Sequence, residues 1–319
     1  MAYPGILLGS CAWVNVSMLG ELFHRRYPAG MTTDDYRSGT GIDTTVPHSA
    51  RIWNYWLGGK DNYPVDREAG EAWLAIDPEM GVAVKASREF LQRAVRYLAR
   101  EAGIRQFLDI GTGLPTADNT HEVAQRVAPD ARIVYVDNDP LILAHARALM
   151  TSTPEGATHY MHTDMRDAAH LLELASEHLD LGKPVAVVLQ MVLGHLPTEQ
   201  EVRALIRALV DAVVPGSYLL ICDAIETEEA QAAQKAGQQY NHSGAVPYHV
   251  HPLAVLRSRF DGLEFVEPGL VSAPRWRPDD RDGLPSVGLG EPEPVTNVFG
   301  GLARKPTSWA ASTRASDPS

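Results

Sequence analysis

The sequence has few cysteines and no excess of positive charge. Cys11 and Cys222 are the only two cysteines among 319 residues, which excludes a disulfide framework and a four-cysteine zinc site. This cysteine usage fits a reducing cytoplasm, where we expect the protein to reside. The formal net charge of −12 offers no basic surface to neutralise a phosphate backbone, so we expect no nucleic-acid partner.

Long apolar runs are also absent. The mildly apolar stretch 6–19 is interrupted by polar residues, is too short to span a bilayer and has no positive region before it. We therefore expect neither a signal peptide nor a membrane partner. Residues 1–47 are predicted to form a poorly ordered leader, with Met1 and Met31 both open as the start of translation.

The chain changes character twice along its length. Residues 48–100 follow a helical pattern rich in tryptophan and tyrosine, with a turn-forming break at 57–64, and are predicted to form a helical cap. Short apolar runs then alternate with helical patterns over 101–305, which predicts the main α/β domain. The Ser, Thr, Ala and Pro residues of 306–319 are predicted to be a disordered tail.

This alternation is typical of a doubly wound, Rossmann-like parallel sheet with crossover helices. The predicted strands cover 106–110, 133–137, 158–161, 185–190, 218–222, 263–266 and 295–303. The predicted helices between them cover 116–127, 140–150, 167–177, 198–213 and 226–238. Because crossovers are right-handed, a ligand crevice should open at the carboxyl ends of the first strands.

A glycine turn follows the first predicted strand. Gly111 and Gly113 allow a sharp turn and a close approach of a ligand to the backbone, although a simple tight turn would have the same glycines. Asp137 ends the second predicted strand, 24 residues beyond Gly113. A carboxylate at this position can accept two hydrogen bonds from a ribose diol, which favours a nucleoside ligand over a solvated acidic loop.

The charge beside the turn distinguishes two cofactors. Asp109 lies two residues before Gly111, and Thr116 stands where a dinucleotide fingerprint has a third small residue. A carboxylate would repel a pyrophosphate but would attract the ammonium and sulfonium groups of S-adenosylmethionine. The sequence therefore favours S-adenosylmethionine over a nicotinamide cofactor, which is the alternative on the same fold.

A further carboxylate follows the third predicted strand. Asp164 could accept a hydrogen bond from the exocyclic amine of adenine, with Met165 packed on the ring face. The alternative is that Asp164 caps a helix that starts near Arg166, because aspartate is a common N-cap.

These acidic and glycine positions resemble the motifs of class I S-adenosylmethionine-dependent methyltransferases. Four segments are also similar to a bacterial S-adenosyl methyltransferase family formerly catalogued as a domain of unknown function: RIWNYWLGGKDNY (51–63), DRE (66–68), FDGLEFVEPG (260–269) and RWRP (275–278). The resemblance covers 48–305 and implies a seven-stranded, mostly parallel sheet whose last strand, 295–303, is antiparallel. Because Pro115 and Thr116 replace the usual third small residue of the loop, we expect Pro115 to stiffen the entry to the next helix and Thr116 to be its N-cap.

The predicted cofactor-binding residues are Asp109, Gly111, Thr112, Gly113, Asp137, Asn138, Asp164, Met165 and Gln190. On the acceptor side, His195 follows the fourth predicted strand and could be a general base. The alternative is that its ring only bonds the backbone before the next helix.

The turn in the cap supplies other candidates for holding the acceptor or covering the cofactor. They are Tyr55, Lys60, Asp61, Asn62 and Tyr63, and the alternative is that they form packing and a solvated turn. No metal site is expected, because His249 and His251 have no Asp, Glu or Cys at a supporting spacing.

The function predicted from these features is transfer of a methyl group to a small-molecule acceptor that the sequence does not identify. The alternative is a regulator or interaction protein that binds S-adenosylmethionine without catalysis, because a fold does not by itself determine a function. The sequence does not indicate the oligomeric state.

Overall fold

The central strands of the chain are apolar and mostly buried, as in a parallel sheet that is covered on both faces. The computed structural model describes residues 43–115, 118–139, 142, 151–226, 231–278 and 296–309. The strands are β1 (Gln106–Ile110), β2 (Arg132–Asp137), β3 (Ala157–His162), β4 (Ala186–Gln190), β5 (Tyr218–Glu226), β6 (His251–Pro252), β7 (Glu264–Phe265), β8 (Val271–Ser272) and β9 (Val298–Arg304).

Seven of these strands form one continuous sheet. Their order is β3-β2-β1-β4-β5-β9-β7, with β1 to β5 parallel and β9 antiparallel to both of its neighbours. Two strands of two residues each lie off this path: β6 pairs with β5, and β8 pairs with β9. The predicted mostly parallel sheet with an antiparallel last strand is therefore confirmed, and the seven predicted strands form its main path, while the two short strands bring it to nine among the described residues.

Helices cover both faces and one end of the sheet. They are α3 (Ser49–Trp56), α4 (Pro64–Leu74), α5 (Met80–Arg100), α6 (Thr120–Val127), α8 (Ala168–Ser176), α9 (Glu199–Ala212), α10 (Gln231–Tyr240) and α11 (Leu253–Ser258), with single 3-10 turns η1 (Leu193–His195) and η2 (Ala273–Arg275). No helix among these described segments is long and apolar enough to cross a membrane.

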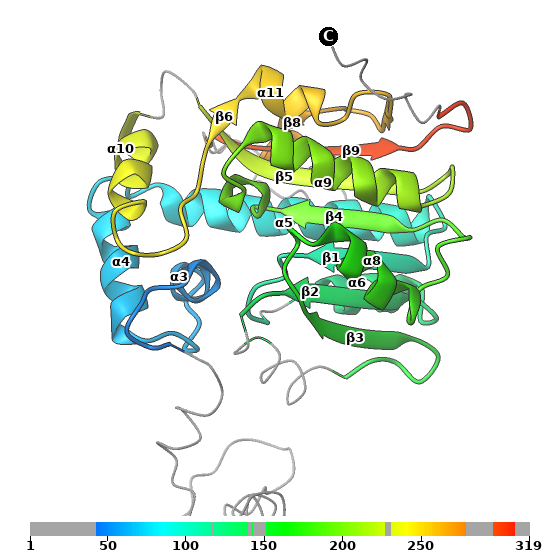
Figure 1. Cartoon of the computed structure of the whole chain (residues 1–319), viewed down its shortest axis with the longest axis horizontal. Helices are drawn as coiled ribbons and strands as arrows, with labels where there is room; N and C mark the ends of the chain where they lie inside the picture. Colours follow the sequence, from blue (N-terminus) through cyan, green and yellow to red (C-terminus); the bar gives the residue numbers. More distant parts are fainter. Residues whose placement is uncertain are drawn as a thin grey trace, which may run out of the picture. The chain divides into compact units, whose positions relative to one another are not determined.

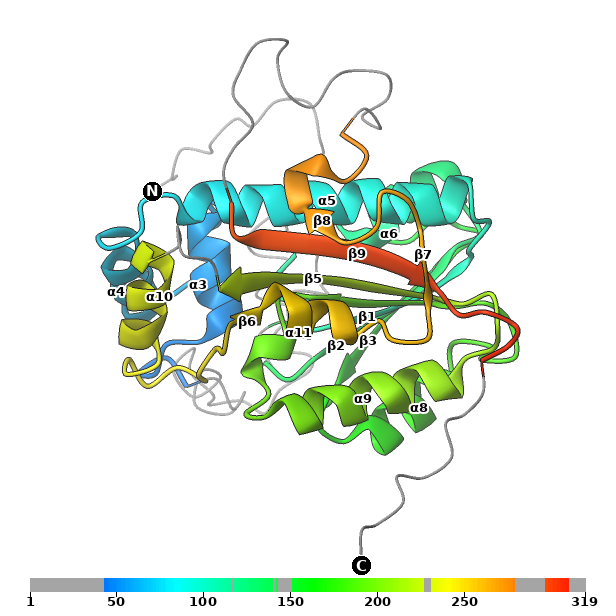
Figure 2. The ribbon, with the colours of Figure 1, turned by 90° about the horizontal axis from the view of Figure 1, so that it is seen from above.

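Side chains alternate between the two faces of each strand, so each strand contributes residues to two separate hydrophobic cores. In β1, Phe107 packs into the core beneath α5 and α6, whereas Leu108 packs into the core beneath α8 and α9. Figure 2 shows these helix pairs on opposite sides of the sheet. The result is a three-layer α/β arrangement in which the strand ends, rather than the faces, are accessible to a ligand.

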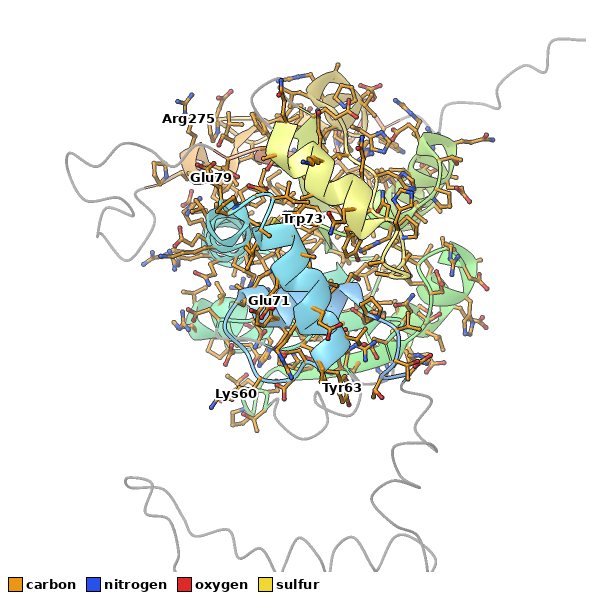
Figure 3. All side chains as sticks on the ribbon, turned by 90° about the vertical axis from the view of Figure 1, so that its left-hand side faces the viewer. Lys60, Tyr63, Glu71, Trp73, Glu79 and Arg275 are labelled. Carbon is orange, nitrogen blue, oxygen red and sulfur yellow. The ribbon has the colours of Figure 1, made fainter. Side chains whose placement is uncertain are left out.

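The region expected to be a helical cap contains three helices with different positions. Helices α3 and α4, together with α10 from late in the chain, lie at the end of the sheet where β1, β2 and β4 terminate (Figure 1). Helix α5 instead runs along one face and supplies the buried Phe90 and Leu98. Figure 3 views the end of the sheet directly and shows Trp73 between α4 and α10.

The sequence-based boundaries differ from the structure mainly next to the glycine turn. Helix α6 begins at Thr120 with Asn119 as N-cap, and the side chains of Asn119 and Glu122 form a capping box. The prediction that this helix starts at Thr116 is therefore wrong, because a better capping pair, whose N-cap is Asn119, lies three residues later. Thr116 itself lies outside the described residues, as do residues 1–42, most of the helix expected at 140–150, and the tail beyond 309.

Strand β5 is longer than its apolar run suggests. It continues to Glu226, four residues past the predicted end at Cys222, because it pairs with β9 along that length and then with β6. Residue 226, where the next helix was predicted to begin, is therefore still in the strand, and helix α10 is described over Gln231–Tyr240.

Candidate functional site

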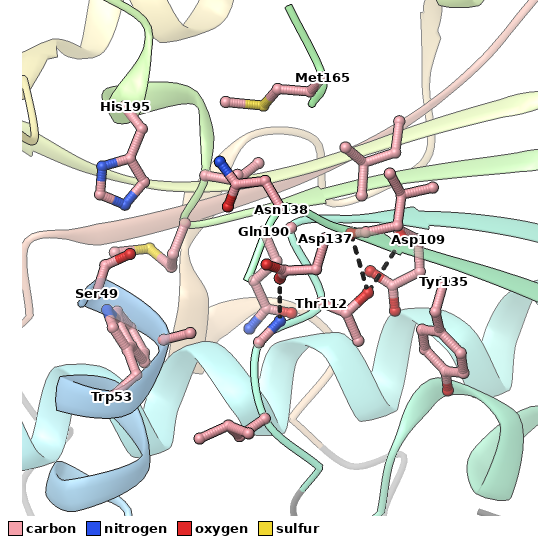
Figure 4. Close-up of a pocket in the computed structure, with 18 of the residues that line it drawn as sticks. Ser49, Trp53, Asp109, Thr112, Tyr135, Asp137, Asn138, Met165, Gln190 and His195 are labelled. Carbon is pink, nitrogen blue, oxygen red and sulfur yellow. Dashed lines mark hydrogen bonds between the residues drawn. The ribbon is translucent and has the colours of Figure 1, made fainter. Parts of the chain in front are cut away.

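A cavity of about 220 Å³ opens where β1, β2 and β4 end, beside helix α3. We call it the first cavity. The nine residues predicted to bind the cofactor all line it, and so does His195. Figure 4 shows His195 on the same side as Ser49 and Trp53 of α3, with Asp109 and Tyr135 on the opposite side. Among the residues predicted from the sequence, the structure thus brings together positions up to 86 residues apart, from Asp109 to His195.

The glycine turn forms one wall of the first cavity. Gly111 and Gly113 have φ angles of +74° and +67°, a conformation that other residues rarely adopt. A Cβ on Gly111 would lie 2.3 Å from Cγ2 of Val192, whereas a Cβ on Gly113 would have no heavy atom within 4 Å. Gly111 is thus required for packing against the turn after β4, and Gly113 leaves open space where a ligand can approach.

This difference predicts that Gly111→Ala destabilises the fold more than Gly113→Ala does. Both variants carry the same backbone strain, but only the first forces a methyl group against a stiff β-branched side chain. We expect an extra loss of about 1–3 kcal/mol in the free energy of unfolding, as for other overpacked sites. Denaturant titration of both variants measures it, and adding Val192→Ala should recover part of the loss. Equal destabilisation would contradict the packing role of Gly111.

Asp137 is fixed at the end of β2 by two backbone amides. Gly113 donates to Oδ2 at 2.9 Å, and Asp139 donates to Oδ1 at 3.0 Å. Burial raises the pKa of the Asp137 carboxyl, while these two hydrogen bonds oppose the rise. A carboxylate has about four acceptor positions, so capacity for a ribose diol remains after both amides are bound.

Asp109 is buried at the end of β1, and Oγ1 of Thr120 donates to its Oδ2 at 2.6 Å. Burial raises the pKa of this carboxyl to about 6, against the opposing effects of Thr120 and of the Arg88 guanidinium. Arg88 also lines the first cavity. Arg88 could not be found from the sequence, because it lies in α5, more than 20 residues before the glycine turn, with no motif around it.

The raised pKa makes stability depend on pH in a defined direction. The Asp109 carboxyl is harder to ionise in the folded protein than in the unfolded chain, so the folded state loses stability as the pH rises from about 4 to about 6. Asp109→Asn avoids this loss and keeps an acceptor for Thr120. Relative to the parent, its free energy of unfolding should rise by up to roughly 3 kcal/mol across that pH range. Urea titrations at pH 4.5 and pH 7.5 test this, and a pH-independent difference would contradict it.

Asp164 lines the first cavity with a partly exposed side chain and is held by Arg166. The Arg166 guanidinium donates to both carboxylate oxygens, with Nε at 3.0 Å from each, and holds the pKa of Asp164 below its usual value. The N-cap of α8 is Asp167 and not Asp164, so Asp164 does not serve as the helix cap. Met165 lines the cavity beside it.

One polar side chain on the wall of the first cavity, Gln190, is incompletely hydrogen-bonded. Its Oε1 is buried and has no hydrogen-bond donor among the described residues. Because an unpaired buried acceptor is costly, a ligand N–H or O–H at this point would stabilise the site. Together with three carboxylates on the walls, this fits a cofactor that carries an ammonium, a ribose diol and an exocyclic amine.

His195 ends η1 with its ring fixed by the backbone. Nδ1 lies 2.9 Å from the carbonyl oxygen of Pro247. Because a carbonyl oxygen only accepts, Nδ1 carries the proton and Nε2 of the neutral ring keeps its lone pair. Burial lowers the pKa of His195 below its ordinary 6.5, so the ring is neutral at pH 7. The backbone hydrogen bond considered as the alternative role is thus present, and it leaves Nε2 able to accept a proton.

Tyr248 supports His195 from the side, with ring centroids 5.1 Å apart and an interplanar angle of 83°. The hydroxyl of Tyr248 donates to Asp223, whose other oxygen pairs with Arg259 at 3.0 Å. Arg259 also pairs with Glu199 at the start of α9. This buried network fixes the loop that carries the hydrogen-bond partner of His195.

The predicted acceptor or lid residues do not line the first cavity. The Tyr55 hydroxyl donates to Glu71, and the backbone amide of Asp61 and Nδ2 of Asn62 both donate to Oδ1 of Asn54. The backbone amide of Tyr63 donates to Asp66 at the start of α4.

Lys60 is exposed and lies at the periphery of the sheet end in Figure 3. Helix α3 and the residues just before and after it do line the cavity, through His48, Ser49, Ala50, Trp53, Asn54 and Leu57. Their helical spacing in the sequence indicates a common face of α3. The sequence alone does not show that this face turns toward the strand ends. No three His, Cys, Asp or Glu side chains converge as metal ligands within the described part of the chain.

Comparison with known proteins agrees with this geometry. Residues 35–306 match the model of the S-adenosyl methyltransferase family. A DUF574 family protein from Streptomyces avermitilis is 41% identical, with a TM-score of 0.77, over 83% of this chain and 99% of that one. A protein from Thermobifida fusca is 34% identical, with a TM-score of 0.73, over 84% of this chain and 97% of that one. No curated protein matches the chain.

The family match covers most of the chain, and the two solved structures are matched over almost their whole length. The resemblance seen in the sequence is therefore confirmed. The chain belongs to the S-adenosyl methyltransferase family and is an S-adenosylmethionine-dependent methyltransferase.

Proposed function

We propose that the chain transfers the methyl group to a small-molecule acceptor by in-line displacement, with His195 as the general base. The observation that carries this proposal is the position of His195. Its Nε2 is unprotonated, and the ring lines the same cavity as the predicted cofactor residues. A protein that only bound the cofactor would not need a proton acceptor at this position.

The walls of the first cavity divide into three binding functions. Asp137 would hold the ribose diol. Asp164 and Met165 would hold the adenine, by hydrogen bonding and by packing on the ring. Asp109 would face the ammonium group of the methionine part, and Arg88 would face its carboxylate, because opposite charges attract strongly where water is excluded.

S-adenosylmethionine, when bound, supplies a methyl group on a positively charged sulfur. The remaining catalytic effects come from the chain itself. Helix α3 covers the cavity at the sheet end and restricts the access of water, which strengthens the electrostatic interactions inside. The fixed turn after β4 holds His195 in one orientation, and such alignment reduces the entropic cost of reaching the transition state.

The experiment that tests this function uses S-adenosylmethionine labelled in its methyl group and a metabolite extract. We expect label to appear in one or a few small molecules, which mass spectrometry then identifies. A protein that binds S-adenosylmethionine tightly but labels nothing in extracts of varied origin would contradict transfer and would favour a cofactor-binding regulator. Label appearing only in protein or nucleic acid would contradict a small-molecule acceptor.

A further inference from the structure

A second cavity, of about 60 Å³, lies between α3, α4, α10 and the end of β5. It shares four wall residues with the first cavity: Ser49, Trp53, Met191 and His195. Met191 has a φ angle of +51°, a conformation uncommon for a side-chain-bearing residue and often found at functional sites. The two cavities therefore meet at His195.

Five aromatic side chains line the second cavity. They belong to Trp53, Trp56, Trp73, Tyr240 and Tyr248. Successive rings make edge-to-face contacts, with centroid distances of 6.0 Å for the first pair, 5.5 Å for Trp56 and Trp73, and 5.7 Å for Trp73 and Tyr240. The ring series thus extends from the boundary with the first cavity to helix α10.

Charged side chains are almost absent from these walls. No lysine or arginine lines the second cavity within the part of the chain that the structure describes. The one carboxylate, Asp77, accepts the backbone N–H of Glu79 at 3.2 Å just before α5 begins. There it faces the positive end of a helix dipole, so it is already compensated and does not call for a cationic ligand. A charged occupant would lose its hydration without gaining a partner.

We propose that the second cavity binds the methyl acceptor, and that the acceptor is a flat aromatic molecule carrying a neutral hydroxyl group. This inference rests on the proposed methyl transfer. Aromatic walls favour an aromatic occupant through edge-to-face and stacked contacts, beyond simple burial of apolar area. The hydroxyl is required because the acceptor must present a removable proton to Nε2 of His195 where the cavities meet.

The transfer step balances without a further reagent. The acceptor oxygen forms a bond to the methyl carbon while the carbon–sulfur bond breaks, and the electron pair of that bond stays on sulfur, which becomes a neutral thioether. The hydroxyl proton passes to Nε2 of His195. The imidazolium then releases this proton to solvent, since the pKa of the ring is low.

The test measures binding of phenol to the complex of the full chain with S-adenosylhomocysteine, by saturation-transfer NMR titration. Occupation of the first cavity by the product cofactor restricts phenol to other sites. Cyclohexanol and benzylamine serve as saturated and cationic probes of similar size. We expect phenol to bind, and both of these to bind roughly threefold to tenfold more weakly. Equal or tighter binding of either one would overturn the proposed acceptor class.

Helix α10 offers a matched pair of variants. Ala233 lines the second cavity, whereas the neighbouring Ala232 is exposed. Ala233→Phe should fill the cavity and weaken phenol binding at least tenfold, and Ala232→Phe should leave it within about twofold. Both should keep the parent's affinity for S-adenosylhomocysteine and its thermal midpoint, which shows that they are folded. Phenol binding that Ala233→Phe does not weaken would overturn the location.

The extract assay and the phenol-binding measurements together distinguish failure of this inference from failure of the proposed function. Label transfer in the extract assay together with failure of phenol to bind would overturn the acceptor class and leave methyl transfer intact. Phenol binding that Ala233→Phe abolishes, with no label transferred to any hydroxylated aromatic molecule, would overturn the acceptor role of the cavity. Transfer to such a molecule, lost in Ala233→Phe and kept in Ala232→Phe, would support both.

Discussion

Replacing His195 by alanine is expected to lower the rate of methyl transfer by a hundredfold or more. General-base catalysis contributes about 10²–10⁴-fold to such rates, and the structure leaves Nε2 as the acceptor of the proton. The affinity for S-adenosylmethionine should stay within about twofold, because the ring lies at the end of the first cavity away from Asp109. Labelled-methyl assays and calorimetry measure the two quantities separately.

A neighbouring histidine provides the control. The side chain of His249 is exposed, and its backbone amide donates to the carbonyl oxygen of Gly194 in η1 at 2.7 Å. His249→Ala should therefore keep the parental rate. A His195→Ala variant with full activity would remove His195 from the mechanism, whatever the control shows.

The pH profile gives a second readout of the same residue. A general base works only when unprotonated, and burial lowers the pKa of His195. The rate in the parent protein should therefore fall with decreasing pH, with its midpoint below the 6.5 of an ordinary histidine. Glutamine does not titrate, so the residual rate of His195→Gln should not show the decrease at low pH that is due to protonation of His195. A midpoint well above pH 6.5 would contradict a neutral, buried base.

Asp137→Ala should weaken the binding of S-adenosylmethionine by tenfold to more than a hundredfold. Each hydrogen bond to a charged group contributes about 1.5–3 kcal/mol, and 1.4 kcal/mol corresponds to a factor of ten. The variant also removes the carboxylate that accepts the Gly113 amide, so the glycine turn loses its anchor at the same time. Calorimetric titration measures the affinity, and a thermal melt of the free protein reports how far the fold is affected.

Asp130 is a matched control for this variant. It pairs with Arg105 at 3.0 Å, and its side chain is 61% exposed. Asp130→Ala changes the net charge by the same amount, and it removes only a surface ion pair of small energetic effect. Its affinity should equal that of the parent. If Asp137→Ala also stayed within twofold of the parent, Asp137 would not be a cofactor ligand.

The position of the carboxylates could be predicted from the sequence because parallel strands bring their carboxyl ends to one edge. Once strands were placed before Gly111 and at Asp137, sequence order alone required Asp109, Asp137 and Asp164 to lie near one another. The sign of their charge then distinguished the cofactors. The structure brings all three to the first cavity, and the family match confirms the cofactor class.

Long-range packing explains what the sequence did not show. Arg88 lines the first cavity because α5 packs along a sheet whose strands come later in the chain, and no local pattern reveals this. The position of Trp53 also depends on such packing. Its large apolar area favoured burial in a helix core, yet it lies on the wall between the two cavities. The partners of a single side chain depend on which helix faces meet, and periodicity does not determine that.

Some residues of the segments that resemble the family are buried and stabilise the fold around the site. Trp276, in the later segment, is fully buried against Phe90 and Tyr97 of α5. Its carbonyl oxygen accepts a hydrogen bond from the buried Arg93 at 2.7 Å. In the opening segment, Arg51 is buried and pairs with Asp66. These residues hold α3 and α5 in place around the site without lining the second cavity.

A crystal structure of the complex with S-adenosylhomocysteine tests the central claim most directly. We predict that the ribose hydroxyls bind Asp137, that the adenine lies between Asp164 and Met165, and that the sulfur faces the wall shared by the two cavities at His195. A nucleoside bound away from these carboxylates, or a sulfur atom directed away from His195, would contradict it.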